Sequence, residues 1–220
     1  MKKLLLSALG ATLLFSACKK NDDDNSNTTK AKVMFTNAAL DVDSLRARVN
    51  TNNIQTIAFL GSTGYVNVDA TSSATIDFVY TGSGSVFQSK TTSLVAGNAY
   101  SAFAGGDLNT KAVIVTADDL KAPASGMAKI RFVNLSPTNL NAIAYVGTAT
   151  VDSNIAFGSV TSFKEVAAGT QTITVVGVSP ASANLSGQTL TAGKIYTFVF
   201  SGTFGGSGNA ALKLTPITNN

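Results

Sequence analysis

KIRFVNLS, residues 129–136, is an imperfect copy of KVMFTNAA, residues 32–39, and this pair decides the fold class. In the later copy Ile130 and Phe132 point to one side of an extended chain, while Arg131 points to the other. Alternation with a period of two is typical of a strand with one apolar and one polar face. One buried face and one solvated face predict an antiparallel sheet.

The similarity between the two copies extends far beyond these eight residues. Four more pairs of segments follow in the same order, with offsets that stay between 96 and 100 for the whole set. They are residues 57–70 with 155–168, 75–80 with 172–177, 93–106 with 189–202, and 111–123 with 210–220. This is an internal repeat. We therefore predict two domains, residues 32–122 and 128–218, with the joint at residues 123–126.

Each copy is predicted to be built from strands alone. Charged residues are only 13% of the 220 residues, and glycine, serine, threonine and asparagine fill most of the polar remainder. Turn signals recur about every 8–12 residues, and no window of helical length has a sustained 3.6-residue period. Seven or eight short strands at this spacing predict an all-β fold of two tandem antiparallel β-sandwich domains.

The first 17 residues are predicted to be a signal peptide. Lys2 and Lys3 form a positive start, and residues 4–15 form an apolar stretch that is too short to span a bilayer, which takes about 20 residues. Ala17 then precedes Cys18, the only cysteine. This order of features is typical of a secretory signal.

Phe15-Ser16-Ala17-Cys18 resembles the bacterial lipobox, although the usual leucine of the first position is Phe15 here. The resemblance implies cleavage before Cys18 and attachment of lipid to its sulfur, and several acyl chains give a stable membrane anchor. The alternative is a buried free cysteine in an uncleaved helix.

The residues after Cys18 look like the export signal of lipoproteins from Bacteroidetes, a lysine followed by acidic residues: Lys19, Lys20, Asp22, Asp23 and Asp24. The resemblance implies an outer-membrane lipoprotein that faces the cell exterior. A plain solvated spacer on a periplasm-facing lipoprotein is the alternative. In both cases residues 18–31 form a lipidated polar tether.

Three stretches of the second copy resemble a family known as domain of unknown function 4397. They are IRFVNLSP (130–137), NIAFGSVTSFKEVAAGTQTITV (154–175) and LTAGKIYTFVFSG (190–202). The first copy is more divergent, because it lacks the Ser-Pro step. The resemblance implies tandem immunoglobulin-like β-sandwiches on an extracytoplasmic protein, and it supplies no catalytic residue.

An Ala-Gly-x-x-Tyr motif occurs in both copies, with Gly97 and Tyr100 in the first and Gly193 and Tyr196 in the second. A glycine here permits positive φ in a turn, and the tyrosine that follows can bury its ring while its hydroxyl fixes the corner. We interpret the four residues as structural, with ligand binding by the tyrosines as the alternative.

The chain lacks the residues that common catalytic and metal sites require. It has no histidine and one cysteine, which excludes Ser-His-Asp and Cys-His catalysis, an intrachain disulfide and Cys/His metal clusters. Asp41/Asp43 and Asp118/Asp119 are interpreted as solvated turn carboxylates, with a weak calcium site as the alternative. We predict no catalytic residue, no cofactor and no metal.

Charge and glycine content add two negative expectations. The formal charge of +4 falls to +2 without Lys2 and Lys3, and the other lysines are scattered, so no nucleic-acid partner is expected. GTFGGSGN (202–209) precedes a strand and not a helix, so it is read as a long hairpin with Phe204 exposed, and not as a phosphate-binding loop.

These features predict a non-enzymatic, lipid-anchored protein of the outer membrane that serves adhesion or binds a protein partner. Glycan binding for polysaccharide uptake is the first alternative, weakened by the absence of tryptophan. The second alternative is a fimbrial subunit that polymerises by strand exchange after cleavage near Arg46-Ala47-Arg48.

Overall fold

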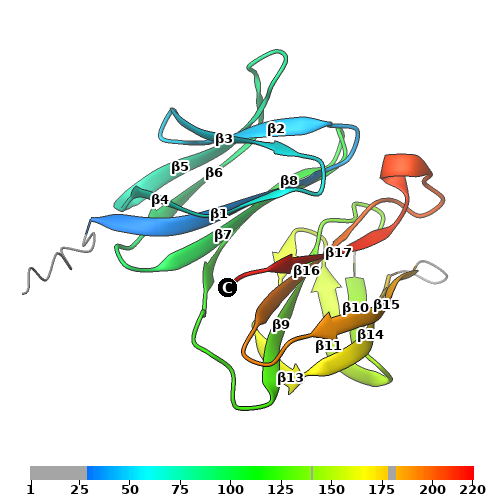
Figure 1. The fold of residues 1–220 in the computed structure, drawn as a ribbon. Helices are drawn as coiled ribbons and strands as arrows, with labels where there is room; N and C mark the ends of the chain where they lie inside the picture. Colours follow the sequence, from blue (N-terminus) through cyan, green and yellow to red (C-terminus); the bar gives the residue numbers. More distant parts are fainter. Residues whose placement is uncertain (1–28, 140, 178–181) are drawn as a thin grey trace, which may run out of the picture.

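The computed structural model describes residues 29–139, 141–177 and 182–220, so the predicted signal peptide, lipobox, Cys18 and export signal lie outside the described residues. Figure 1 shows the described chain as two stacked halves made of strands. Within these residues no helix is long and apolar enough to cross a bilayer. The strands of the first half are β1 (Lys30–Ala39), β2 (Ser44–Val49), β3 (Asn52–Ala58), β4 (Ser62–Asp69), β5 (Thr71–Tyr80), β6 (Val86–Leu94), β7 (Ala99–Gly106) and β8 (Lys111–Asp118).

The second half repeats this pattern with one additional strand among the described residues. Its elements are β9 (Met127–Asn134), β10 (Asn141–Val146), β11 (Ala149–Ala156), β12 (Ser159–Val160), β13 (Lys164–Ala167), β14 (Gly169–Val176), β15 (Ser182–Leu190), β16 (Ile195–Ser201), the 3₁₀ turn η1 (Gly208–Ala210) and β17 (Lys213–Thr218). β12 and β13 both pair with β9. Together they occupy the place that the single strand β4 holds beside β1.

Each half consists of two sheets. In the first half the strand orders are β4-β1-β7-β8 and β3-β2-β5-β6. In the second half they are β12-β9-β16-β17 and β11-β10-β14-β15. The predicted all-β fold of packed sheets is therefore confirmed.

Alternating apolar residues fill the space between the two sheets of each half. In the first core Phe35 of β1 meets Phe78 of β5 edge to face, with ring centroids 6.2 Å apart. In the second core Phe132 of β9 stacks on Phe198 of β16 at 5.6 Å. The period-two pattern of the sequence thus predicts the inward positions correctly, since successive side chains of a strand point to opposite faces.

The expectation of purely antiparallel sheets is wrong for one strand pair in each half. β1 runs parallel to β7, and β9 runs parallel to β16. In both halves the first strand enters the middle of its sheet beside a strand much later in the sequence. Alternation reports which face is buried, and it carries no information on the direction of a non-local partner.

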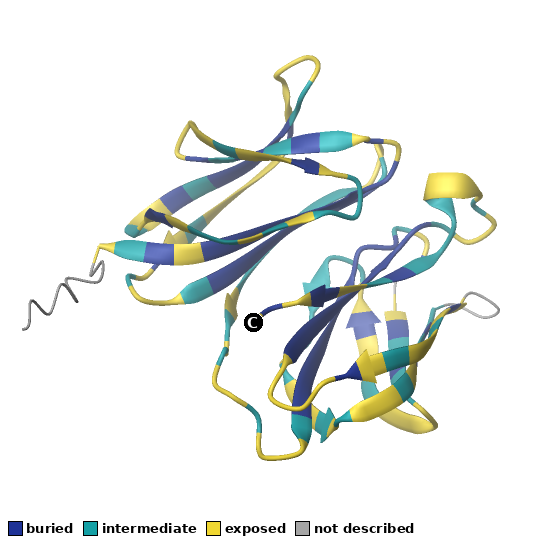
Figure 2. Cartoon of the chain, viewed as in Figure 1, coloured by how far each residue is buried: buried dark blue, intermediate teal, exposed yellow. Residues whose placement is uncertain are grey.

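The expectation of one solvated face is also wrong for two of the four sheets. β7, β9 and β16 are buried along almost their whole length, and Figure 2 shows them as dark ribbons. The sheet β4-β1-β7-β8 packs its outer face against the outer face of β12-β9-β16-β17. A third apolar cluster lies there: Met34, Ala38, Phe103, Val133, Leu135, Val199 and Ile217. We call the two outer faces the docking faces.

Two predicted boundaries differ slightly from the structure. β1 begins at Lys30, so the last two residues assigned to the tether belong to the sheet, where Lys30 forms an ion pair with Asp69. The segment between the halves, residues 119–126, is longer than the predicted joint at 123–126. Its first residue is fixed by an ion pair of 2.9 Å between Asp119 Oδ2 and Lys129 Nζ.

Candidate functional site

The strand register shows which residues of the two docking faces occupy equivalent positions in the two repeats. In the parallel pair β1–β7, Met34 lies opposite Ser101. In the parallel pair β9–β16, Arg131 lies opposite Thr197. Met34 and Arg131 are therefore equivalent positions, as are Ser101 and Thr197.

Two more equivalences follow from the flanking strands. Tyr100 lies opposite Ala117, and Tyr196 lies opposite Thr218, so the next residues, Asp118 and Asn219, correspond to each other. Beside β1 and β9, the hydroxyls of Thr63 and Thr161 accept hydrogen bonds from the backbone nitrogens of Phe35 and Phe132, both at 3.0 Å. The residues two places further on, Tyr65 and Phe163, are thereby equivalent as well.

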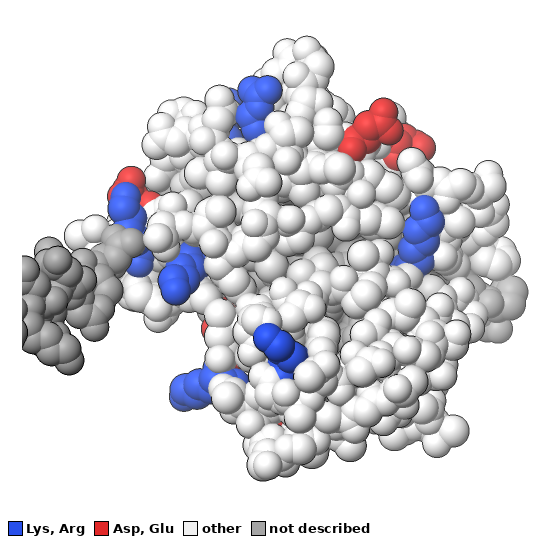
Figure 3. All heavy atoms as spheres, in the orientation of Figure 1, with Lys and Arg blue, Asp and Glu red and all other residues white. Residues whose placement is uncertain are grey.

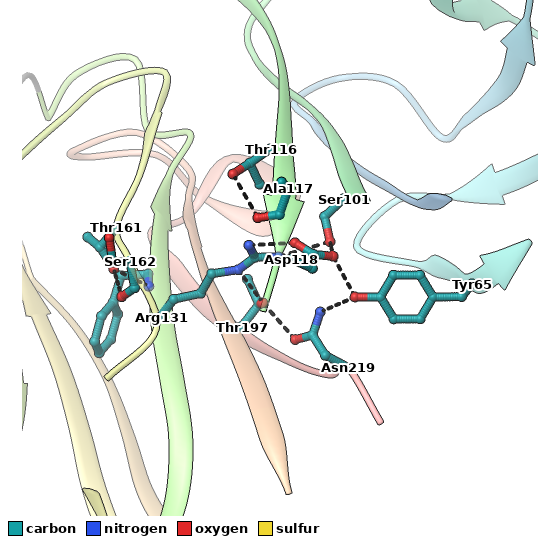
Figure 4. A network of polar contacts seen from close by, with 11 residues as sticks. Tyr65, Ser101, Thr116, Ala117, Asp118, Arg131, Thr161, Ser162, Thr197 and Asn219 are labelled. Carbon is teal, nitrogen blue, oxygen red and sulfur yellow. Dashed lines mark hydrogen bonds and ion pairs between the residues drawn. The ribbon is translucent and has the colours of Figure 1, made fainter. Parts of the chain in front are cut away.

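Six of these residues form a closed ring of polar contacts across the docking faces (Figure 4). The first half contributes three residues. Asp118 Oδ1 lies 2.7 Å from Arg131 Nη1 and forms an ion pair with it. Asp118 Oδ2 accepts hydrogen bonds from Ser101 Oγ at 2.6 Å and from Tyr65 Oη at 2.5 Å. All three donors therefore converge on one carboxylate.

The second half closes the ring. Arg131 donates from Nη2 to Ser101 Oγ and from Nε to Thr197 Oγ1, both at 2.9 Å. Thr197 donates to Asn219 Oδ1 at 2.7 Å, and Asn219 Nδ2 donates to Tyr65 Oη at 3.1 Å. The hydroxyls of Tyr65, Ser101 and Thr197 each donate one hydrogen bond and accept another, so docking leaves none of these three groups without a partner.

The ion pair at the centre of the ring is fully buried. The side chain of Arg131 is 1% exposed and that of Asp118 is 0% exposed. The Arg131 guanidinium also lies over two aromatic rings, 4.3 Å from the Phe163 centroid and 5.7 Å from the Phe103 centroid. A desolvated arginine gains from such contacts, because the negative face of the ring attracts the cation.

Burial changes the pKa values of two residues of the ring, Arg131 and Tyr65. It lowers the pKa of the Arg131 guanidinium, and the Asp118 carboxylate opposes that change. Burial also raises the pKa of Tyr65 above its usual range, and the negative charge of Asp118 raises it further. Tyr65 is therefore a neutral hydrogen-bond donor at physiological pH, and not a base. The arrangement is suited to joining the two halves, and it offers no activated nucleophile.

The interpretation of Asp118 as a solvated turn carboxylate is wrong, because β8 places its side chain inside the docked faces. Its neighbour Asp119 is 54% exposed in its side chain, and the hydrogen bond from Lys129 lowers its pKa. One signal in the sequence marks this site: Arg131 replaces an apolar residue, Met34, at an equivalent position of the repeat.

Both Ala-Gly-x-x-Tyr motifs adopt the same geometry. Gly97 and Gly193 each have φ of +81°, a conformation that L side chains rarely adopt. Tyr100 Oη accepts a hydrogen bond from Val95 N, and Tyr196 Oη accepts one from Thr191 N, both at 3.0 Å. Both tyrosines are 7% exposed, which leaves little surface for a ligand.

Replacing Tyr196 with phenylalanine is expected to lower the free energy of unfolding by about 1 kcal/mol, since the Thr191 N–H loses its acceptor. Urea denaturation followed by circular dichroism measures the change. Tyr145→Phe is the matched control, because the hydroxyl of Tyr145 makes no hydrogen bond to a described residue. Equal effects of the two changes would contradict the assignment of the corner hydrogen bond.

The other candidate residues lie apart from the docking faces. Asp41 and Asp43 lie in the β1–β2 connection, and Asp41 has φ of +59°. In the described part of the chain, no three His, Cys, Asp or Glu side chains gather as metal ligands would. The 202–209 segment connects the antiparallel strands β16 and β17, as expected for a hairpin, and Phe204 is 57% exposed.

The suggested fimbrial cleavage segment does not fit the structure. Arg46, Ala47 and Arg48 lie in β2, which pairs with β3 on one side and β5 on the other. Ala47 is fully buried, and Arg48 Nη2 lies 2.8 Å from Asp77 Oδ2. Cleavage here would cut an interior strand of a sheet instead of releasing a leading one.

Two sandwich-like repeats that dock through equivalent faces define a tandem all-β repeat protein. The family model named Domain of unknown function (DUF4397) matches residues 31–143 and residues 137–220. The chain belongs to this family, and the two matched regions agree with the internal repeat.

Comparison with curated proteins found no match. Among solved structures, a family 26 carbohydrate-binding module from Eubacterium rectale, determined in complex with maltoheptaose, is similar to this chain at 10% sequence identity. The match covers 85% of this chain and 95% of the module, with a TM-score of 0.30.

Proposed function

We propose that this chain is a non-catalytic, lipid-anchored module of the cell envelope that presents its two repeats as one rigid unit to a partner. The observation that carries the proposal is the buried ring between the docking faces, centred on Arg131 and Asp118. A buried network of polar groups that pair with one another across an interface favours one relative arrangement of the parts it joins. A rigid unit on a polar tether suits binding at a distance from a membrane.

The direction of β1 supports a division of the molecule into a tethered end and a free end. The strand enters at Lys30, next to the predicted tether, and ends at Ala39. The connection that follows it therefore lies at the opposite end of the first repeat. Figure 3 shows acidic side chains gathered at the end of this repeat that faces away from the grey start of the chain. This free end is the surface that a partner would meet.

A hollow of about 430 Å³ lies at this free end, lined by Asp41, Val42, Asp43, Ser44, Tyr80, Thr81, Gly82 and Ser83. Lys111 Nζ lies 5.6 Å from the centroid of the Tyr80 ring on the same repeat. Carboxylates and hydroxyls beside an aromatic ring are the groups that proteins use to hold sugars. Glycan binding is therefore the second candidate function.

Cell fractionation with surface proteolysis tests the anchored function. The wild-type chain is expected in the outer-membrane fraction and to be degraded when intact cells meet a non-permeant protease. Cys18→Ala should leave the membrane fraction, because no thiol remains to accept lipid. Changing Asp22, Asp23 and Asp24 to alanine should keep the chain in the membrane but protect it from the protease. A wild-type chain found free of membranes would overturn the proposal.

A glycan array probed with the purified chain tests the second candidate. The expected result is binding that Asp41→Ala and Asp43→Ala together weaken by at least tenfold, with unchanged thermal stability. Phe204→Ala is the control, because its exposed ring lies outside the hollow. Binding that survives the aspartate changes would remove the hollow as the glycan site.

A further inference from the structure

The tethered end of the first repeat, where β1 begins, has an open hollow of about 390 Å³. Its lining includes Lys32 on β1, the β6–β7 turn at Gly97 and Asn98, and the first residues of the linker, 119–121. Two backbone hydrogen bonds hold the turn against the start of β1: Gly97 N donates to Lys30 O at 2.8 Å, and Lys32 N donates to Asn98 O at 2.9 Å. The hollow therefore lies beside the point where the predicted tether joins the sheet.

The hollow has two positive charges that no ion pair offsets. Lys32 and Lys121 are both exposed, and neither forms an ion pair with a described residue. The two carboxylate residues of the lining are already paired. Asp119 belongs to the ion pair of 2.9 Å that fixes the start of the linker, and Asp118 is paired with Arg131 inside the docking faces. The hollow is therefore suited to an anionic ligand.

The turn that lines the hollow also presents an apolar side chain to solvent. Val95 is 53% exposed. Its backbone is fixed, because Val95 N donates to Tyr100 Oη at 3.0 Å and Val95 O accepts from Asn98 N at 3.2 Å. The second repeat, which the tether does not join, has the polar residue Thr191 at the equivalent position. An exposed apolar tip beside unpaired lysines is suited to the interface of an anionic membrane.

The predicted anchor would bring this end of the molecule close to a membrane. Residues 18–29, between Cys18 and β1, span at most about 42 Å when extended. As a coil they would average about 20 Å. Figure 3 shows basic side chains beside the grey start of the chain. The phosphate groups of lipid headgroups would therefore be the anions nearest to the hollow.

We propose that the tethered end is a membrane-contact surface for anionic lipids, in which Lys32 and Lys121 hold headgroup phosphates and Val95 enters the headgroup region beside them. This inference rests on the lipid anchor of the proposed function and adds an orientation to it. An anchor by itself sets the distance from the bilayer, whereas a second contact at the tethered end directs the free end outward. The contact can be weak, because the anchor keeps the local concentration of lipid high.

Co-sedimentation with lipid vesicles tests the proposal on the chain from residue 18 onward, which contains every residue of the described fold. Cys18→Ala is included, so that no lipid anchor contributes to binding. This chain is expected to bind vesicles of equal parts phosphatidylglycerol and phosphatidylcholine, and not vesicles of phosphatidylcholine alone. Binding should fall as salt rises, because salt screens exposed charges.

A pair of double variants separates the hollow from net charge. Lys32→Gln with Lys121→Gln should weaken binding to the anionic vesicles by at least about tenfold, since each lysine near such a surface contributes roughly a factor of five. The matched control is Lys111→Gln with Lys213→Gln, which removes the same charge where β8 and β17 begin, at the other end of the molecule. It should change binding by less than about twofold.

Three results would overturn the proposal. The first is no binding to the anionic vesicles, and the second is an equal loss in the two double variants. The third is binding that appears only after Asp22, Asp23 and Asp24 are changed to alanine, which would assign the hollow to the acidic segment of the chain itself. Because the tested chain carries no lipid, failure here leaves the anchor to be judged by cell fractionation alone.

A tryptophan probe shows which end of the molecule meets the vesicle. The chain has no tryptophan, so Val95→Trp introduces a single one. Its fluorescence should shift to shorter wavelength when the lipid-free chain binds the anionic vesicles, because the ring leaves water. Phe204→Trp is the control, at a side chain that is 57% exposed in the β16–β17 connection, and it should show no shift. An unchanged spectrum at position 95, or equal shifts at both positions, would contradict the proposal.

Discussion

Arg131→Met is expected to lower the free energy of unfolding by about 3–5 kcal/mol, because it leaves the Asp118 carboxylate buried without a cation. Methionine is the residue that the first repeat carries at the equivalent position, Met34, where it lies in the apolar cluster between the faces. The change in packing should therefore contribute little, and most of the loss should come from the unpaired charge. Urea denaturation, followed by circular dichroism, measures the effect.

The companion change Asp118→Asn separates charge from packing. Asparagine is the residue of the second repeat at this position, Asn219, so both docking faces would then carry the same neutral residues. The double variant should recover most of the loss, because exchanging a whole buried ion pair for neutral groups is often close to neutral in stability. A double variant that is as unstable as the sum of the single ones would show that the charge is not the cause.

The sequence predicts the two sandwich cores well because their signal is local. In KIRFVNLS the alternation alone places Ile130 and Phe132 inside, and the structure buries both. The same alternation assigns Arg131 to solvent, although its side chain is 1% exposed. A strand sequence shows which face is polar, but whether another sheet covers that face depends on contacts with residues far along the chain.

The parallel direction of the β1–β7 pair cannot be predicted from the sequence for the same reason. Nothing in residues 30–39 or 99–106 indicates that β1 and β7 lie side by side and parallel, since the pairing joins segments about 70 residues apart. The division of the fourth strand into β12 and β13 is equally non-local, because both pieces are defined by their pairing with β9. The alignment of residues 32–39 with 129–136 does mark one residue of the site, since Arg131 stands where the first copy has Met34.

A different part of the interface depends on the absence of a side chain. Gly105 lies in β7 beneath Leu135 of the second repeat, and a Cβ at Gly105 would lie 2.6 Å from Leu135 Cβ and 2.7 Å from its Cδ1. Leu135 is fully buried, so it has no solvent to move into. The next residue adds a direct link between the repeats, since Gly106 N donates to Leu135 O at 3.2 Å. The backbones of the two repeats can approach this closely only over glycine.

Gly105→Ala is therefore expected to destabilise the protein by about 1–3 kcal/mol, the usual cost of forcing an extra carbon into a packed interface. The control is Gly82→Ala, where no atom lies within 4 Å of the added Cβ, and this change should be close to neutral. Chemical denaturation of both variants at one pH gives the comparison.

Leu135→Ala tests whether the contact itself is responsible, because alanine is the residue at the equivalent position of the first repeat, Ala38. Alone it should cost about 2–5 kcal/mol, through the cavity that it leaves. Combined with Gly105→Ala it should cost less than the sum of the two single losses, since the added carbon no longer meets the two Cδ atoms, although alanine keeps the Cβ that lies 2.6 Å away. Strictly additive losses in the double variant would mean that the two Cδ atoms of Leu135 are not what opposes a side chain at Gly105.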